Sequence, residues 1–201
     1  SCRHLDEVIK INKNTGNIMW RLGGEASKNN EFTFLNDTTD GFVGFSHQHS
    51  AIESSKGTII LFDNGNLKSA NPSSRAVEYE IDVTNKTVRK VWERYPAKRT
   101  FSVAMGSVEE LPNGNILVGY GKFNAQASTQ TVVAEEVTRS GKVAVSITNG
   151  ANCDVTSFRV SKSTMGMAGC YSAISTPGTY DFSCDDSTTY MQVKVASVSQ
   201  T

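Results

Sequence analysis

Long hydrophobic runs, an excess of charge of either sign and paired metal-binding cysteines are all absent from this sequence of 201 residues. No apolar stretch reaches the roughly 18 residues that a membrane-spanning helix needs, so we expect no membrane span. Lys and Arg together number 20, as do Asp and Glu, and the formal net charge is zero. Since nucleic-acid-binding proteins usually carry a basic excess, we expect no nucleic-acid partner. Hydrophobic residues make up 38% of the chain, which is enough for a buried core.

Cysteine is scarce and unevenly distributed. The four positions are Cys2, Cys153, Cys170 and Cys184. They contain no Cys-x-x-Cys pair, which argues against a zinc ribbon or a thioredoxin-like site. Three of them lie in a Ser-, Thr- and Gly-rich region, which favours disulfides formed in an oxidising compartment over the alternative of buried free thiols. Asn36 and Asn85 begin Asn-x-Thr triplets and are predicted glycosylation sites. We therefore expect a secreted or extracellular glycoprotein.

Helical periodicity is also missing, whereas short β-rich runs separated by turns occur along most of the chain. The runs 8–11 and 18–22 flank an Asn- and Gly-rich turn, which predicts a β-hairpin. Hairpins of this first type are predicted again, and they alternate with a second type. The further hairpins of the first type span 76–92 and 132–147, and those of the second type span 49–62 and 107–120.

Two hairpins in alternation make a four-stranded unit, and the unit recurs at spacings of roughly 55 to 70 residues, as propeller blades can. We predict an all-β fold with about three β-propeller blades over residues 1–160, with an open two-sheet sandwich as the alternative. Trp20 and Trp92 occupy matching places and are interpreted as packing residues, with stacking on a substrate as the alternative. Residues 161–201 are predicted to form a small disulfide-bearing β appendage or the closing strands of a sandwich.

A propeller closes with at least about four blades, so three blades are too few. We therefore expect further blades upstream of residue 1, or a partner chain that supplies them, through self-assembly or otherwise.

Histidine occurs at only three positions, His4, His47 and His49. Its near-neutral titration suits acid–base and nucleophilic chemistry. His47 and His49 would share one face of a strand, which also suits a metal with His4 or Asp63 as a third ligand. Polar loop histidines with no special role are the simpler alternative, and we expect no metal. Gly-x-Ser-x-Gly elbows and glycine-rich phosphate loops are absent.

Several short segments, taken in order, carry a more specific signal. They are 1–11, 15–24, 45–51, 61–66, 74–79, 106–108 and 111–115. Together these segments resemble the arylsulfotransferase family over about residues 1 to 160. The resemblance implies the C-terminal part of a six-bladed β-propeller with a site at its central channel. It also implies an enzyme that moves a sulfuryl group from an aryl sulfate donor to a phenolic acceptor, through a sulfated histidine and without a cofactor.

By the same resemblance, His49 is the nucleophile and His4 a second catalytic histidine. Arg21 is the implied catalytic arginine, and Arg75 is a rival for that role. We expect His47, Asn64 and Arg75 to bind substrate. An imidazole nitrogen can attack sulfur, and a guanidinium can neutralise the sulfuryl oxygens.

A function of a different class stays open. The same fold can serve as a non-catalytic structural or adhesive module of a cell-surface assembly, and the Ser- and Thr-rich tail favours that alternative. A ligand-binding propeller is a third possibility.

Overall fold

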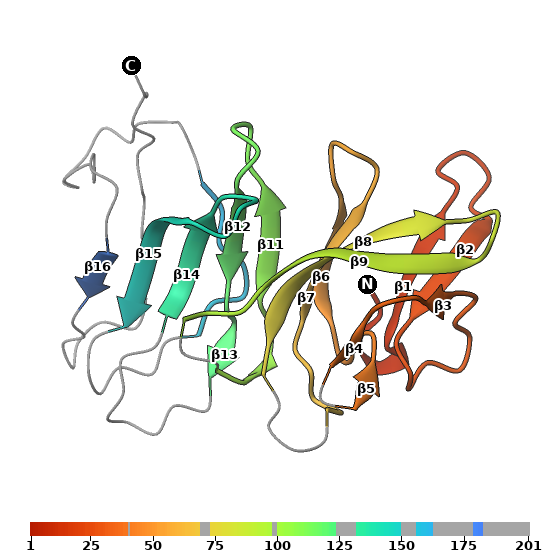
Figure 1. Ribbon diagram of the computed structural model, residues 1–201, viewed down its shortest axis with the longest axis horizontal. Helices are drawn as coiled ribbons and strands as arrows, with labels where there is room; N and C mark the ends of the chain where they lie inside the picture. Colours follow the sequence, from red (N-terminus) through yellow and green to blue (C-terminus); the bar gives the residue numbers. More distant parts are fainter. Residues whose placement is uncertain are drawn as a thin grey trace.

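The computed structural model describes residues 1–39, 41–68, 73–97, 100–123, 132–149, 156–162 and 179–182. Within these ranges the chain is β-structure apart from loops and one short 3-10 helix, η1 (Arg3–Leu5). No helix of the described residues could therefore cross a membrane. Figure 1 shows the sheets following one another across the molecule in chain order. The expected all-β class is confirmed.

The first sheet is the antiparallel hairpin of β1 (Glu7–Ile11) and β2 (Ile18–Gly23). Its turn is stabilised by the side chain of Asn12, whose Oδ1 accepts hydrogen bonds from the backbone N–H groups of Asn14 and Thr15. Gly16 follows with a φ of +74°, a conformation that glycine adopts without strain. The Asn- and Gly-rich turn thus fixes the register that places Trp20 and Leu22 in the core.

The second and third sheets each contain four consecutive antiparallel partners, as the repeating unit predicted. The second sheet runs through β6 (His49–Glu53), β7 (Ile59–Asp63), β8 (Arg75–Asp82) and β9 (Thr87–Arg94), and the third through β11 (Ser107–Glu110), β12 (Ile116–Gly119), β14 (Val132–Val137) and β15 (Val143–Asn149). All five predicted hairpins are confirmed, with ends that differ by one or two residues.

Shorter strands complete the described structure. Two of them join the large sheets in parallel: β3 (Thr33–Phe34) pairs with β9, and β16 (Thr179–Phe182) pairs with β15. The others form two small sheets, β4 (Thr38–Thr39) with β5 (Phe42–Val43), and β10 (Ser102–Ala104) with β13 (Lys122–Phe123).

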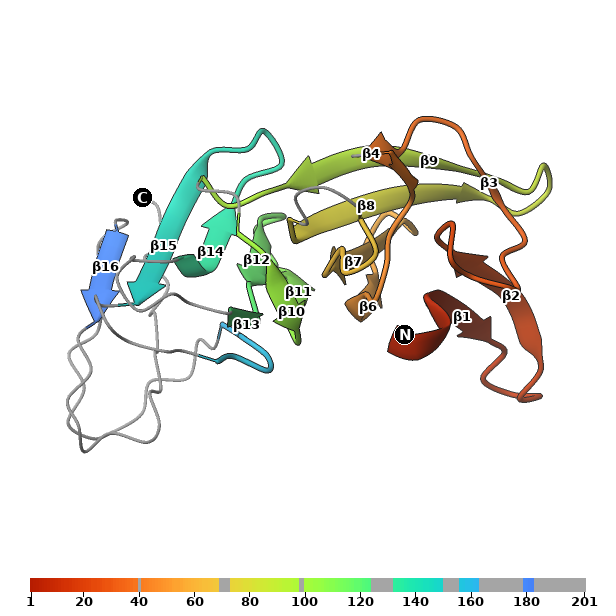
Figure 2. The ribbon, with the colours of Figure 1, turned by 90° about the horizontal axis from the view of Figure 1, so that it is seen from below.

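The large sheets pack face to face, with β7 buried on both of its faces. Ile59 and Leu61 face a core shared with β1, β2 and β8, whereas Ile60 and Phe62 face a core shared with β11, β12 and β14. Figure 2 shows the same succession of sheets from another direction. An apolar run such as 59–62 therefore belongs to a strand between two layers, where no face is left for polar residues.

Some expectations reach beyond the described residues. Cys2 is a free thiol. Cys153, Cys170 and Cys184 lie outside the described residues, so the predicted disulfides stay a prediction. Of the predicted C-terminal appendage, residues 161, 162 and 179–182 are described.

Replacing Leu61 by alanine tests the two-sided burial of β7. Leu61 is fully buried, and its loss should lower the free energy of unfolding by about 2–5 kcal/mol through lost burial and the cavity left behind. Val83→Ala, at a half-exposed position in the turn after β8, should change it by less than about 0.5 kcal/mol. Urea unfolding followed by tryptophan fluorescence measures both, and equal effects of the two changes would contradict the assignment.

Candidate functional site

Three segments that are distant in sequence meet at one place: residues 1–7, residues 45–49 and residues 102–106, which comprise β10 and the link to β11. Gln48 joins the first two segments, because its buried amide donates a hydrogen bond of 2.7 Å to the backbone oxygen of Glu7. Arg3 joins the first and third segments, because its Nη2 donates a hydrogen bond of 3.0 Å to the backbone oxygen of Val103. All three histidines of the chain lie on the first two segments.

His49 is the first residue of β6, and its ring is held by the neighbouring sheet. Its Nδ1 lies 2.6 Å from the backbone oxygen of Gly106. A carbonyl oxygen only accepts hydrogen bonds, so Nδ1 carries the proton, and in the neutral ring Nε2 keeps its lone pair. The ring edge also meets Phe158, at 5.1 Å between ring centroids, and Phe158 is 60% exposed. His49 therefore offers one defined nucleophilic nitrogen beside an exposed aromatic ring.

The turn that carries the Gly106 carbonyl is fixed by close packing. Gly106 has a φ of +103°, and a Cβ at this position would lie 2.2 Å from the ring of Phe62. Asn64 is fully buried and donates hydrogen bonds to the backbone oxygens of Ser102 and Met105, at 2.9 and 3.0 Å. The structure thus places Asn64, an expected substrate-binding residue, beneath the turn that orients His49.

His47 differs from its predicted position, because it precedes β6 and has a φ of +50°. The expected shared strand face with His49 is therefore wrong. One carboxylate oxygen of Asp6 accepts two hydrogen bonds from His47, from its backbone N–H at 2.5 Å and from its ring Nδ1 at 3.1 Å. The exposed ring of His4 meets the His47 ring edge to face, with centroids 5.9 Å apart. His4 and His47 therefore form one surface cluster with Asp6 behind it.

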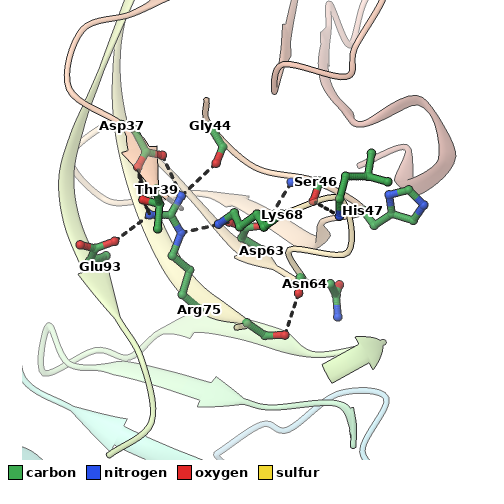
Figure 3. Close-up of polar contacts among 12 residues, drawn as sticks. Asp37, Thr39, Gly44, Ser46, His47, Asp63, Asn64, Lys68, Arg75 and Glu93 are labelled. Carbon is green, nitrogen blue, oxygen red and sulfur yellow. Dashed lines mark hydrogen bonds and ion pairs between the residues drawn. The ribbon is translucent and has the colours of Figure 1, made fainter. Parts of the chain in front are cut away.

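Arg75 lies beneath this cluster in a buried network of ionic groups, shown in Figure 3. Its guanidinium donates two hydrogen bonds to Asp37, at 3.0 and 2.8 Å, and one each to Asp63 and Glu93, at 3.0 and 2.7 Å. The side chain of Arg75 has no exposed surface. Every described contact of Arg75 is thus with other groups of the protein.

Asp63 connects this network to the histidine loop. Its Oδ2 accepts hydrogen bonds from Arg75 and from Lys68, the latter at 2.5 Å, and its Oδ1 accepts one from the backbone N–H of Ser46 at 3.1 Å. Burial lowers the pKa of Lys68 below its usual value, although the attraction of Asp63 opposes this. Oδ2 of Asp63 thus belongs to the ionic network, and Oδ1 holds the backbone of the residue that precedes His47.

A metal is not suggested by this arrangement. Asp63, the acidic residue considered as a third ligand, is engaged with Lys68 and Arg75. Across the part of the chain that the structure describes, no group of three or more His, Cys, Asp or Glu side chains is arranged to hold a metal ion.

Arg21 also forms an ion pair with an acidic side chain. Its Nη1 donates a hydrogen bond of 2.9 Å to Glu7, whose side chain is buried. Arg3 differs from Arg21 and Arg75, because no carboxylate contact is described for it, and its Nε is buried without a described partner. The guanidinium of Arg3, the residue before His4, therefore has a backbone carbonyl as its described partner and no described acidic one.

Sequence reasoning missed four residues of this site: Arg3, Asp6, Gly106 and Phe158. Asp6 follows His4 by two positions and could have been considered as its partner or that of another histidine. The sequence held no comparable signal for Gly106 or Phe158, whose relation to His49 exists only in the folded chain.

The two predicted glycosylation sites lie at exposed positions. The amide of Asn36 pairs with the backbone of Lys90, and the amide of Asn85 donates to Asp82 at 2.7 Å. Their glycosylation stays a prediction.

Comparison with known proteins agrees with the resemblance in the sequence. Residues 1–159 match the family model described as arylsulfotransferase (ASST). A curated relative, the arylsulfate sulfotransferase AssT of Escherichia coli O6:H1 strain CFT073, is 39% identical over 84 residues. That match covers 37% of this chain and 14% of the relative, so the chain spans a small part of the relative's length.

The ionic network predicts a loss of stability in acid. Burial alone would raise the pKa of Asp37, but the hydrogen bonds and charge of Arg75 outweigh it, and the pKa lies below its usual value. A carboxyl whose pKa is lowered by folding stabilises the protein above its unfolded pKa, and this contribution is lost as the pH falls through its folded pKa. The free energy of unfolding should therefore fall below about pH 4.

Asp37→Asn should flatten this acid dependence, at the expense of lower stability at neutral pH. Urea unfolding between about pH 7 and about pH 3 measures the difference. The matched control is Glu80→Gln, at an exposed position on β8, which should leave the curve unchanged. An unaltered acid slope in Asp37→Asn would show that Asp37 does not contribute to it.

Proposed function

This chain belongs to the arylsulfotransferase family, and we propose that it forms part of an enzyme that transfers a sulfuryl group from an aryl sulfate to a phenol, with His49 as nucleophile. The observation that carries the proposal is the hydrogen bond between His49 Nδ1 and the Gly106 oxygen. It leaves Nε2 as the nitrogen that can attack sulfur. The partners in this proposal are an aryl sulfate donor and a phenolic acceptor.

The fold that we propose for the whole protein is a β-propeller. Two sheets, each with four antiparallel strands and one added parallel strand, stack face to face with one hairpin in chain order, with separate apolar cores between them. Such stacking is the packing of neighbouring blades. His49 lies where adjoining sheets meet, because its ring on β6 forms a hydrogen bond with Gly106, just before β11. Additional blades from the same protein or from a partner chain would complete the channel.

The transfer divides into two displacements at sulfur. In the first, Nε2 of His49 forms a bond to sulfur while the bond from sulfur to the aryl oxygen breaks, and the electron pair leaves with the phenolate. In the second, the oxygen of the acceptor attacks the same sulfur and the pair returns to Nε2. Nδ1 keeps its proton and its hydrogen bond to the Gly106 oxygen throughout, so the tautomer of His49 does not change.

We propose Arg3 as the guanidinium that binds the sulfuryl oxygens, in place of Arg21 or Arg75. Arg21 and Arg75 neutralise buried carboxylates, and turning either toward a substrate would leave an unpaired buried charge. Arg3 is half-buried and pairs with a neutral carbonyl, so its charge is available to an anion. His4, on the same short helix, would line the site beside it. The exposed ring of Phe158 suits an aryl group held next to His49.

Replacing His49 tests the proposed nucleophile. Incubation of the full-length protein with 4-nitrophenyl sulfate should release nitrophenol and leave a sulfuryl adduct on the peptide that contains His49, found by mass spectrometry of the rapidly quenched protein. His49→Ala should abolish both the adduct and the transfer while circular dichroism stays unchanged. Transfer that persists in this variant would exclude His49 as nucleophile, and a folded wild-type protein that is inert toward several donors would favour a non-catalytic propeller.

Replacing Arg3 tests the proposed sulfuryl-binding residue. Arg3→Gln should slow the formation of the His49 adduct by roughly 100-fold, as loss of one well-placed donor to a developing negative charge does. Arg3→Lys should recover part of the rate, because the charge remains while the planar fork is lost. Arg89→Gln, at an exposed position on β9, is the matched control and should leave the rate unchanged. Equal rates in Arg3→Gln and the control would return the role to Arg21.

A further inference from the structure

The three histidines have different hydrogen-bond partners. His49 Nδ1 donates to a neutral carbonyl, whereas His47 Nδ1 lies 3.1 Å from the carboxylate of Asp6. For His4, the described ring contact is with His47 and not with an acidic side chain. A carboxylate compensates the positive charge that an imidazole gains on taking a second proton, and a backbone carbonyl does so far less. His47 therefore has an acidic hydrogen-bond partner that His49 lacks.

The backbone around His47 holds this pairing in place. Its φ of +50° is an uncommon conformation for a residue with a side chain, and the Asp6 oxygen that binds the ring also accepts the His47 backbone N–H at 2.5 Å. On the other side, Asp63 holds the backbone N–H of Ser46. The Asp6 carboxylate is nearly buried, with 8% of its side chain exposed, whereas the His47 side chain is 22% exposed. The Asp6 carboxylate is thus more enclosed than the His47 ring that it contacts.

We propose that His47, oriented by Asp6, is the proton carrier of the sulfuryl transfer. This inference rests on the proposed function. In the first displacement, the protonated His47 gives its Nε2 proton to the departing phenolate oxygen, so a phenol leaves and His47 becomes neutral. In the second, Nε2 of His47 takes the proton of the acceptor phenol as its oxygen attacks sulfur. Protons and charges balance over the cycle, and the Nδ1–H group of His47 keeps its hydrogen bond to Asp6 throughout. Asp6 acts only through His47 and is a positioning residue.

The experiment compares two donors whose leaving phenolates need protonation to different extents. The phenolate released from 4-nitrophenyl sulfate is weakly basic and leaves unaided, whereas that from phenyl sulfate is strongly basic and needs protonation. The phenol burst of the full-length protein is measured by rapid quench with each donor. His47→Gln should slow the burst from phenyl sulfate by about 100-fold or more and that from 4-nitrophenyl sulfate by less than about tenfold, since general acid catalysis contributes about 100-fold or more.

Asp6→Asn should show the same donor selectivity with a smaller loss, because Asn cannot compensate the imidazolium charge. If Asp6→Asn disturbs the loop, His47→Gln alone decides the matter, because it keeps Asp6 and its bond to the backbone. Glu80→Gln serves as the exposed carboxylate control and should affect neither donor.

The outcomes separate this inference from the function on which it rests. Equal losses with both donors, in an active wild-type protein, would overturn the proton-carrier role and leave the transferase standing. Donor selectivity in His4→Gln but not in His47→Gln would move the role to His4. Absence of a burst from either donor in the folded wild-type protein would overturn the proposed function, and this inference with it.

Discussion

The buried ion pairs of Arg75 are the interaction on which the candidate site depends. A fully enclosed guanidinium is tolerable only because Asp37, Asp63 and Glu93 surround it. Removing one member of such a group leaves a charge in a medium that cannot solvate it, which generally lowers stability by about 3–5 kcal/mol. The described charges balance, since Arg75, Lys68 and Lys90 face these three carboxylates. Asp63 also accepts a hydrogen bond from the backbone of Ser46, so the network holds the chain just before His47.

A similar ion pair recurs in the first hairpin with its charges exchanged. Arg75 begins β8 and pairs with Glu93 on β9, just after Trp92. Glu7 begins β1 and pairs with Arg21 on β2, just after Trp20. Both hairpins therefore carry an ion pair between the first residue of one strand and the residue after the tryptophan on the next, with the acidic and basic partners exchanged. Arg21 and Arg75, the two arginines considered for the catalytic role, each have an internal acidic partner in this arrangement.

The strands could be predicted from the sequence because their signals are local. Alternating apolar residues on either side of an Asn- and Gly-rich turn predict a hairpin without knowledge of the rest of the chain, and β1 with β2 shows this. The location of His49 and His4 came from short motifs. The partners of these residues could not be predicted, because Gly106 lies 57 residues from His49 and Asp6 lies 41 residues from His47. The prediction that His47 shares a strand face with His49 was wrong, because the backbone at His47 is not extended.

The bond between His49 and Gly106 joins two successive sheets, since the ring comes from β6 and the oxygen from the turn before β11. The ring nitrogen available for chemistry is consequently a property of how the sheets sit against each other. A small sliding of one layer past its neighbour would break the hydrogen bond of Nδ1 and let the proton move to Nε2, which would remove the lone pair from the nitrogen that we propose as the nucleophile. Apolar contacts between the same two layers, such as Phe62 against Tyr120, therefore help to determine which nitrogen of His49 carries the proton.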